Sequence, residues 1–180
     1  MSRIRIVGGQ WRSRLIDVPD AIGLRPTPDR VREILFNWLG QDLSGLRCLD
    51  LFAGSGALGF EAASRGAAEV VLVENAPYVY EHLKSTAAKL KADNLRLIKA
   101  DAVKFLHGNS EQFDIIFLDP PYKRGWLDQI EPLLDKTLTS QGRVYAESEQ
   151  PVTQLGGLRA IKTGRAGQVH YQLLCFEDDQ

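Results

Sequence analysis

The residues with the clearest chemical potential are Asp119, Pro120, Pro121 and Tyr122, which follow an apolar run typical of a strand. The Asp119 side chain and the Pro120 carbonyl could both accept hydrogen bonds from an exocyclic amine, because two prolines hold that carbonyl rigid and remove competing backbone donors. Tyr122 offers a ring on which an extruded base can stack. The four residues predict a site that localises an amine lone pair for attack on a methyl sulfonium. A strand ended by a Pro-Pro turn is the alternative.

A second motif lies at a strand-to-helix turn. Gly54, Gly56 and Gly59 match the spacing G-x-G-x-x-G, and Glu74 lies 20 residues after Gly54. Glycine lets a ligand approach the backbone of such a loop, and an acidic residue ending the second strand accepts hydrogen bonds from ribose hydroxyls. Alone, the motif fits NAD(P), another adenosine cofactor, or a tight turn without a ligand.

Two further carboxylates favour a cofactor other than NAD(P). Asp50 lies inside the first strand, where a dinucleotide needs no charge but the cationic amino-acid end of S-adenosylmethionine would use one. Asp101, just past the third strand, is placed to accept from an adenine amino group. Ligands bind at the carboxyl ends of parallel strands, so we expect these carboxylates, Glu74 and Asp119 to converge on one crevice. The predicted cofactor-binding residues are Asp50, Phe52, Ala53, Gly54, Gly56, Glu74, Asp101 and Ala102.

The elements that must position these residues alternate along the chain. Nearly continuous apolar strands separated by amphipathic helices predict a parallel sheet covered by helices on both faces. A tight turn at Gly164 and Gly167 predicts a C-terminal antiparallel hairpin. The fold class is therefore α/β, Rossmann-like and mostly parallel. Strands are expected at 47–51, 70–74, 95–99, 114–118 and 142–147, and helices at 57–66, 77–91, 102–107 and 126–138.

The chain begins with a smaller unit. Residues 3–7 and 14–18 read as two strands of a β-hairpin around Gly8-Gly9. Thr27 is expected to cap a helix that has Pro28 at its first position and ends at Gly40. The apolar face of that helix is expected to contain Val31, Ile34, Leu35, Trp38 and Leu39. We divide the chain into an Arg-rich hairpin extension, 1–20, and a catalytic domain, 21–180.

Charge is distributed unevenly. The whole chain has 180 residues and a formal net charge of −1. Residues 1–32 hold seven arginines and three aspartates, a net charge of +4, and no lysine precedes Lys84. Guanidinium groups pair with phosphate and stack on bases, so this region predicts a nucleic-acid contact, with a merely solubilising surface as the alternative. Trp11 is expected to be exposed among these arginines. The predicted contacts within this region are Arg3, Arg5, Trp11, Arg12, Arg14, Arg25 and Thr27.

Composition excludes several classes. With 44% hydrophobic and 25% charged residues the chain is neither disordered nor fibrous. No apolar run approaches the length of a membrane span, and the first residues lack the apolar stretch of a signal peptide. Two cysteines, Cys48 and Cys175, make neither a disulfide framework nor a zinc site, and the three histidines are scattered, so we expect a cytoplasmic protein without a metal.

The motifs resemble a known group of enzymes. Residues 48–66 resemble the cofactor motif of class I S-adenosylmethionine-dependent methyltransferases, and Asp119 to Tyr122 resemble the [D/N]-P-P-[Y/F/W] motif of their amino-methylating members. Residues 5–14, 23–27 and 29–33, with Gly167 to Tyr171, resemble the RsmD-type family of small-subunit ribosomal RNA guanine-N2 methyltransferases. This likeness spans essentially the whole chain.

The resemblance implies a role for each residue group. Asp50, Gly54 and Gly56 would line the methionine end of the cofactor, Glu74 would hold its ribose and Asp101 its adenine. The Asp119 motif would receive the guanine amino group. The hairpin, Lys123 and Arg124 would contact RNA, and the substrate would be a partly or fully assembled small subunit met by a monomer. The alternatives are an adenine-N6 methyltransferase on DNA or another RNA, a non-catalytic ribosome-assembly factor and, weakest, an NAD(P) oxidoreductase.

Overall fold

A computed structural model describes residues 2–21, 24–121 and 125–177. The chain opens with a two-stranded antiparallel ribbon, β1 (Ser2–Arg5) and β2 (Leu15–Val18), in which Ile4 faces Ile16. This confirms the predicted hairpin, although β1 ends two residues early, at Arg5.

The main sheet has eight strands in the order β5-β4-β3-β6-β7-β10-β9-β8. The first five strands of that order pair in parallel, and β10, β9 and β8 follow in antiparallel fashion, which confirms the predicted class. The strands are β3 (Arg47–Asp50), β4 (Glu69–Glu74), β5 (Leu95–Lys99), β6 (Phe113–Leu118), β7 (Leu138–Ser148), β8 (Gln154–Leu155), β9 (Leu158–Ala166) and β10 (Val169–Phe176).

Two features of the sheet differ most from the sequence prediction, the start of β7 and the existence of β8. Strand β7 begins at Leu138, which pairs with Phe113 ahead of a register shift, so it takes the last residue of the helix expected at 126–138 and the three that follow. The two-residue strand β8 has no periodic pattern of its own and was not predicted. The early start of β7 and the strand β8 both depend on pairing with neighbouring strands, which the local sequence pattern does not reveal.

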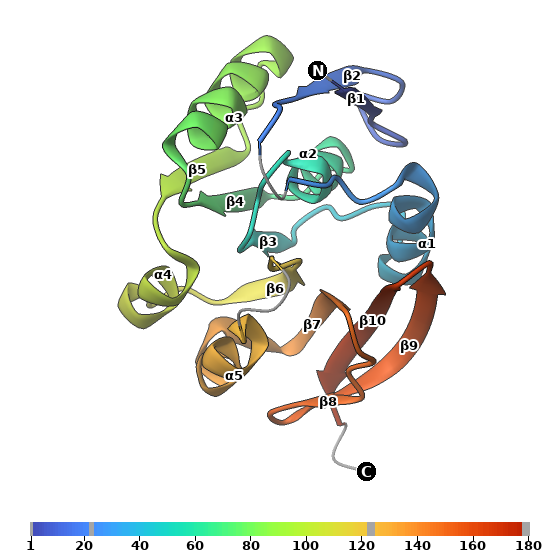
Figure 1. Cartoon of the computed structure of the whole chain (residues 1–180), viewed down its shortest axis with the longest axis vertical. Helices are drawn as coiled ribbons and strands as arrows, with labels where there is room; N and C mark the ends of the chain where they lie inside the picture. The colour runs from blue at the N-terminus through green and yellow to red at the C-terminus, as the bar shows by residue number, and fades with distance from the viewer. Residues whose placement is uncertain (1, 22–23, 122–124, 178–180) are drawn as a thin grey trace.

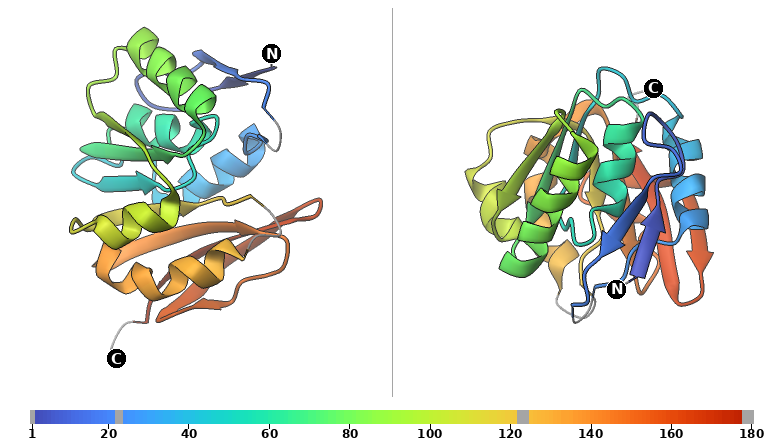
Figure 2. Two further views of the ribbon diagram at one scale, coloured as in Figure 1. Left: turned by 60° about the vertical axis from the view of Figure 1, so that its left-hand side comes forward. Right: turned by 90° about the horizontal axis from the view of Figure 1, so that it is seen from above.

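Helices cover both faces of the sheet, as expected (Figures 1 and 2). Helices α1 (Asp29–Leu39), α2 (Ala57–Ser64) and α3 (Pro77–Leu90) contribute to one apolar core, which the ribbon completes. Helices α4 (Ala102–Gly108) and α5 (Trp126–Thr137) contribute to the core on the other face. No helix in the described ranges is both long and apolar enough to cross a bilayer.

Helix α1 corrects one prediction and confirms another. It ends at Gly40, whose positive φ of 104° suits glycine and whose N–H donates to the Phe36 carbonyl. It starts after Pro28 without a side-chain cap, so the expected Thr27 cap is wrong. The Thr27 hydroxyl instead donates to Glu147 at 2.8 Å, and a hydrogen bond to a carboxylate is stronger than the neutral bond that a cap would make.

The ribbon is fixed to the body through Glu61 of α2, which is fully buried. The backbone N–H groups of Val7 and Gly8 donate to its two oxygens at 2.9 and 3.1 Å. Arg32 contacts one oxygen at 3.0 Å and Arg65 the other at 3.3 Å. Five apolar side chains of the extension join the same core as α1 and α2, namely Ile4, Ile6, Trp11, Ile16 and Val18.

Candidate active site

The candidate site lies at the carboxyl ends of the parallel strands. The chain runs outward from β3 through β4 to β5 and then returns to place β6 on the other side of β3. Ligands of open α/β sheets bind at such a switch point. Asp50 ends β3, Glu74 ends β4, Asp101 follows β5 and Asp119 follows β6. The four predicted carboxylates therefore stand at one edge of the sheet.

The glycine loop between β3 and α2 has the backbone that its sequence predicts. Gly54 and Gly56 both take positive φ, 54° and 84°, and a Cβ on Gly56 would lie 2.3 Å from the Phe60 ring. Glu74 accepts the Gly54 N–H at 2.8 Å and the Ala76 N–H at 3.1 Å. The acid at the end of β4 thus connects the glycine loop to the start of the segment that leads into α3.

Asp50 is buried with one oxygen unsatisfied. It is 1% exposed; Oδ2 accepts the Gly59 N–H at 3.1 Å, and Oδ1 has no hydrogen-bond partner. Burial raises the Asp50 pKa to about 7, further assisted by the charges of Glu74 and Glu147 and opposed by the Gly59 N–H. A buried acceptor without a donor fits an ammonium group brought by a ligand.

Asp119 keeps part of its surface open to solvent, while its carboxyl group lies against Glu147 in the interior. Burial raises the Asp119 pKa well above its usual value, and the charge of Glu147, a hydrogen bond with Glu147 and the charge of Asp50 act in the same direction. Pro120 is buried and Pro121 is exposed. The remaining predicted residues of this loop, Tyr122, Lys123 and Arg124, lie outside the described residues.

Sequence reasoning missed Glu147, near the carboxyl end of β7. This side chain is 7% exposed, and its Oε1 accepts hydrogen bonds from the Tyr145 hydroxyl at 2.7 Å and the Thr27 hydroxyl at 2.8 Å. Strands β6 and β7 are parallel neighbours with Leu118 opposite Ala146, so Asp119 and Glu147 follow at the next position. A charged residue ending the predicted strand 142–147 was the available signal.

Other predicted cofactor residues have visible local roles. Phe52 packs edge-on against Trp126, with ring centroids 5.4 Å apart. Ala53 is buried and its N–H donates to the Val73 carbonyl at 3.0 Å. Asp101 caps α4 by accepting the Lys104 N–H at 3.0 Å, and Ala102 is buried behind it. These contacts fix the rim of the crevice around the glycine loop.

The predicted RNA contacts separate into exposed and interior groups. Trp11 is 6% exposed, so the expectation that it is exposed is wrong: its ring packs in the core beneath the ribbon, where burial of a large aromatic surface outweighs its position at a polar turn. Thr27 is also buried, against Glu147. Arg32, counted in the early positive charge, lies inside on Glu61. The exposed predicted contacts are Arg3, Arg5, Arg12, Arg14 and Arg25.

The linker after the ribbon reaches the crevice at two points. A Cβ on Gly54 would meet Leu24 at 2.9 Å, which places Leu24 against the glycine loop. Thr27 contacts Glu147 three residues later. Arg25, which is exposed, therefore lies in a segment held on both sides by the site. Among the exposed arginines, Arg25 is thus the one whose flanking residues contact the site.

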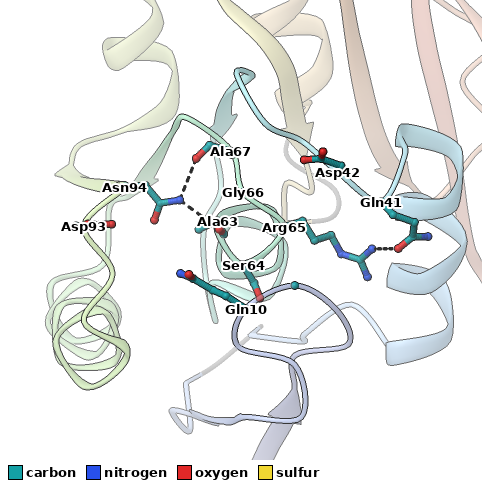
Figure 3. A pocket seen from close by; sticks show the side chains of 11 residues that line it. Gln10, Gln41, Asp42, Ala63, Ser64, Arg65, Gly66, Ala67, Asp93 and Asn94 are labelled. Carbon is teal, nitrogen blue, oxygen red and sulfur yellow. Dashed lines mark hydrogen bonds between the residues drawn. The ribbon is translucent and has the colours of Figure 1, made fainter.

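A separate pocket of about 490 Å³ lies near the amino ends of the strands (Figure 3). Asn94 in this pocket donates to the Ala63 and Ala67 carbonyls, and Arg65 donates to Gln41. The pocket shares no lining residue with the predicted site, which lies at the carboxyl ends of the strands. Among the described residues no group of three or more His, Cys, Asp or Glu side chains is placed to hold a metal. Cys48 is inert, because burial raises its pKa to about 12.

The sheet order, the glycine loop after β3 and Asp119 after β6 define a Rossmann-like methyltransferase of class I. The fold is shared with a solved RNA methyltransferase from Salinibacter ruber in complex with S-adenosyl-L-homocysteine, with a TM-score of 0.68 over 87% of this chain and 97% of that one. The two are 17% identical, so this likeness concerns the fold alone.

Closer relatives identify the family. Residues 4–175 match the family described as Conserved hypothetical protein 95, and the chain belongs to it. Ribosomal RNA small subunit methyltransferase D of Escherichia coli (strain K12) is 48% identical, over 95% of this chain and 89% of its own length. The solved methyltransferase yhhF from Escherichia coli has a TM-score of 0.88 and 45% identity, covering 98% and 99% of the two chains. The chain is thus a methyltransferase, and the RsmD-type resemblance of its motifs is confirmed.

Proposed function

We propose that the protein transfers a methyl group from S-adenosylmethionine to the exocyclic N2 amine of a guanine in small-subunit ribosomal RNA. It acts in the cytoplasm, as a monomer, on a partly or fully assembled subunit. The observation that carries this proposal is the meeting of Asp50 and Asp119 at the switch point of the sheet. The name of the Escherichia coli relative supports the RNA, and the RsmD-type N-terminal segments support guanine N2.

The residues around the glycine loop fit this cofactor. Asp50 Oδ1, buried and unpartnered, would accept from the ammonium of its methionine end. Gly54 and Gly56 leave the backbone open to it, and the Glu74 and Asp101 carboxylates stand where its ribose and adenine would be held. When bound, S-adenosylmethionine supplies an electrophilic methyl group on a sulfonium. The S-adenosyl-L-homocysteine in the Salinibacter ruber structure of the same fold is consistent with this choice.

Asp119 and Pro120 would prepare the amine. A base amine is a poor nucleophile while its lone pair is delocalised into the ring. Acceptors on both N–H groups favour its localisation, and the Asp119 side chain and the Pro120 carbonyl supply two. Burial of Pro120 keeps that carbonyl in place. The work of the site is therefore orientation and charge stabilisation, and the amine proton can leave after methylation without a catalytic base.

The exposed arginines would bind the RNA backbone. Arg3, Arg5, Arg12 and Arg14 lie on or beside the ribbon, and Arg25 lies in the segment that touches the crevice. The balance of −5 on the other 148 residues disfavours binding to nucleic acid in general. The protein would thus recognise a shaped ribosomal surface rather than bare sequence.

Transfer of a labelled methyl group to small subunits and to naked RNA, with identification of the modified base, tests the proposal. Asp119→Ala should lower kcat by about 10²- to 10³-fold, because it removes an acceptor needed in the transition state. Binding of S-adenosylhomocysteine, measured by calorimetry, should remain. Asp93→Ala, an exposed aspartate near the amino ends of the strands, is the control and should keep full activity.

Four results would overturn parts of the proposal. Binding of NADH in place of S-adenosylhomocysteine would exclude S-adenosylmethionine as the cofactor. Full activity of Asp119→Ala would remove that residue from the site. A label recovered on adenine N6 would exclude guanine as the target and favour the adenine-N6 alternative. No transfer to any small-subunit RNA would exclude that RNA as the substrate.

A further inference from the structure

Asp119 has an acidic partner that the methyl-transfer chemistry does not require. Glu147 enters the crevice from β7 and is 7% exposed. Asp119 and Glu147 follow Leu118 and Ala146, which are paired on the parallel strands β6 and β7, and a hydrogen bond with Glu147 is among the causes that raise the Asp119 pKa. Two hydroxyls also donate to Glu147, Tyr145 from the same strand and Thr27 from the linker. The hydrogen bond between Thr27 and Glu147 therefore links the linker to strand β7, two segments that are 120 positions apart in the chain.

Two carboxyl groups in hydrogen-bond contact cannot both be ionised without strong repulsion, so they share one proton. The surroundings decide where that proton lies. Glu147 Oε1 already accepts two hydroxyl protons, which stabilises charge on Glu147. Besides Glu147, the charge of Asp50 from β3 raises the Asp119 pKa and a hydrogen bond with Thr27 lowers it, while Tyr171 from β10 acts on Tyr145; none of these three groups is a cation. The shared proton is therefore held mainly on Asp119 and donated toward Glu147.

We propose that Glu147 is a positioning residue of methyl transfer, which accepts the shared proton from one oxygen of Asp119 and so leaves the other oxygen facing the target amine as an acceptor. The proposal rests on the proposed function, since it concerns the same amine site. In this state Asp119 presents a carbonyl-type oxygen, as an asparagine would at the first position of the [D/N]-P-P-[Y/F/W] motif. The pair keeps one negative charge close to the nitrogen.

That charge acts when the reaction occurs. A bond forms between the methyl carbon and the amine nitrogen, the bond from carbon to sulfur breaks, and its electron pair stays on sulfur. The positive charge of the sulfonium thereby passes to the nitrogen, which then loses one proton to solvent. The negative charge on Glu147 stabilises the nitrogen as its charge develops, and the Asp119 oxygen keeps its orientation because the shared proton anchors the opposite oxygen.

The test compares Glu147→Gln with the wild type on small subunits and labelled cofactor. We expect kcat at pH 7 to fall about 10- to 100-fold through loss of orientation, while affinity for S-adenosylhomocysteine is unchanged. Wild-type kcat should decline at alkaline pH, where the pair loses its shared proton, and the variant should lack that decline. Glu33→Gln, an exposed glutamate of α1, is the control and should keep the wild-type profile. A uniform fall in kcat with an unaltered pH profile would mean that Glu147 only supports the fold, and an unaltered kcat would overturn the proposal outright.

A second measurement is independent of catalysis. The carboxyl ¹³C resonance of Asp119, assigned with Asp119→Asn, should titrate at a lower pH in Glu147→Gln than in the wild type; an unchanged midpoint overturns the shared proton. If Glu147→Gln does not fold, Tyr145→Phe takes its place: loss of one donor to Glu147 should move the Asp119 midpoint, and no movement counts against the proposal. A chain that shows the shared proton but methylates no ribosomal RNA separates failure of the proposed function from failure of this inference.

Discussion

The molecule contains two sets of buried carboxylates, which differ in the hydrogen-bond donors and cations that surround them. Glu61, between the ribbon and α2, receives two backbone N–H groups and two guanidinium groups, those of Arg32 and Arg65. In the crevice, Asp50 has one N–H donor and a bare oxygen, and Asp119 faces another acid. No ion pair from a lysine or arginine to these crevice acids occurs among the described residues.

The difference distinguishes a carboxylate that stabilises the fold from carboxylates that are suited to bind a ligand. A buried charge is expensive unless it is paired and hydrogen-bonded, and Glu61 meets that condition completely. The crevice acids do not, so they reduce stability in the free protein and are stabilised only when a ligand brings donors or positive charge. A methyl donor with an ammonium and a sulfonium, and an amine with two N–H groups, are ligands of that kind.

The largest expected effect on stability comes from breaking the satisfied set. Glu61→Gln replaces the charged carboxylate between two buried guanidinium groups by one neutral acceptor oxygen, and we expect the free energy of unfolding to fall by about 3–5 kcal/mol. Urea denaturation measures this change. Glu81→Gln, an exposed glutamate of α3, should change stability by less than about 1 kcal/mol. A loss for Glu61→Gln no larger than that of the control would contradict the anchoring role.

A smaller effect of opposite sign should come from the unsatisfied set. The Asp50 pKa is raised to about 7 in the folded protein, so its stabilising contribution is complete below the unfolded value near 3.8 and is lost as the pH rises through about 7. Asp50→Asn does not ionise, and we expect it to be more stable than the wild type at pH 8 by at most about 4 kcal/mol, with little difference near pH 4.

Urea denaturation at both pH values checks this prediction, with Asp93→Asn as an exposed control. Calorimetry should show that the same Asp50 variant binds S-adenosylhomocysteine at least about tenfold more weakly, because the acceptor for its ammonium loses its charge. A stability difference that is equal at pH 4 and pH 8 would show that Asp50 does not titrate as the geometry requires.

The smallest effect is expected at the exposed arginines, which belong to neither buried set. Arg3 and Asp17 form an ion pair at 3.0 Å with side chains 65% and 37% exposed, so Arg3→Ala should cost less than about 1 kcal/mol of stability. It should lower the slope of log affinity against log salt for RNA by roughly 1, if its guanidinium contacts a phosphate. Arg159→Ala, which breaks a comparable exposed pair with Glu177, is the matched control, and an equal slope for both variants would exclude Arg3 from the RNA contact.

Burial of the ribbon also determines how the RNA contact can be studied. Removal of residues 1–20 would take Ile4, Ile6, Trp11, Ile16 and Val18 out of the core and leave Glu61 without its two N–H donors. Such a truncation would report loss of folding together with loss of RNA binding. Single substitutions at the exposed arginines separate the two effects.

Local pattern was sufficient for much of the architecture. The apolar runs at 70–74 and 114–118 and the amphipathic helices between strands predicted the parallel sheet, because the periods of helix and strand are written in neighbouring residues. The glycine loop and the Pro120-Pro121 turn could also be predicted, since each backbone conformation requires particular residue types. The boundaries of β7 and the existence of β8 were not, because pairing across the sheet sets both.

The acids at strand ends show where the sequence stops being sufficient. It determined that Asp50, Glu74, Asp101 and Asp119 share one edge, because parallel strands must end on the same side of the sheet. Only the tertiary structure decided that Trp11 is buried, that Arg32 lies on Glu61 and that Thr27 and Glu147 meet beside Asp119. These contacts join residues tens of positions apart, and their energies depend on solvent exclusion and on which charges face each other, which exist only once the chain has folded.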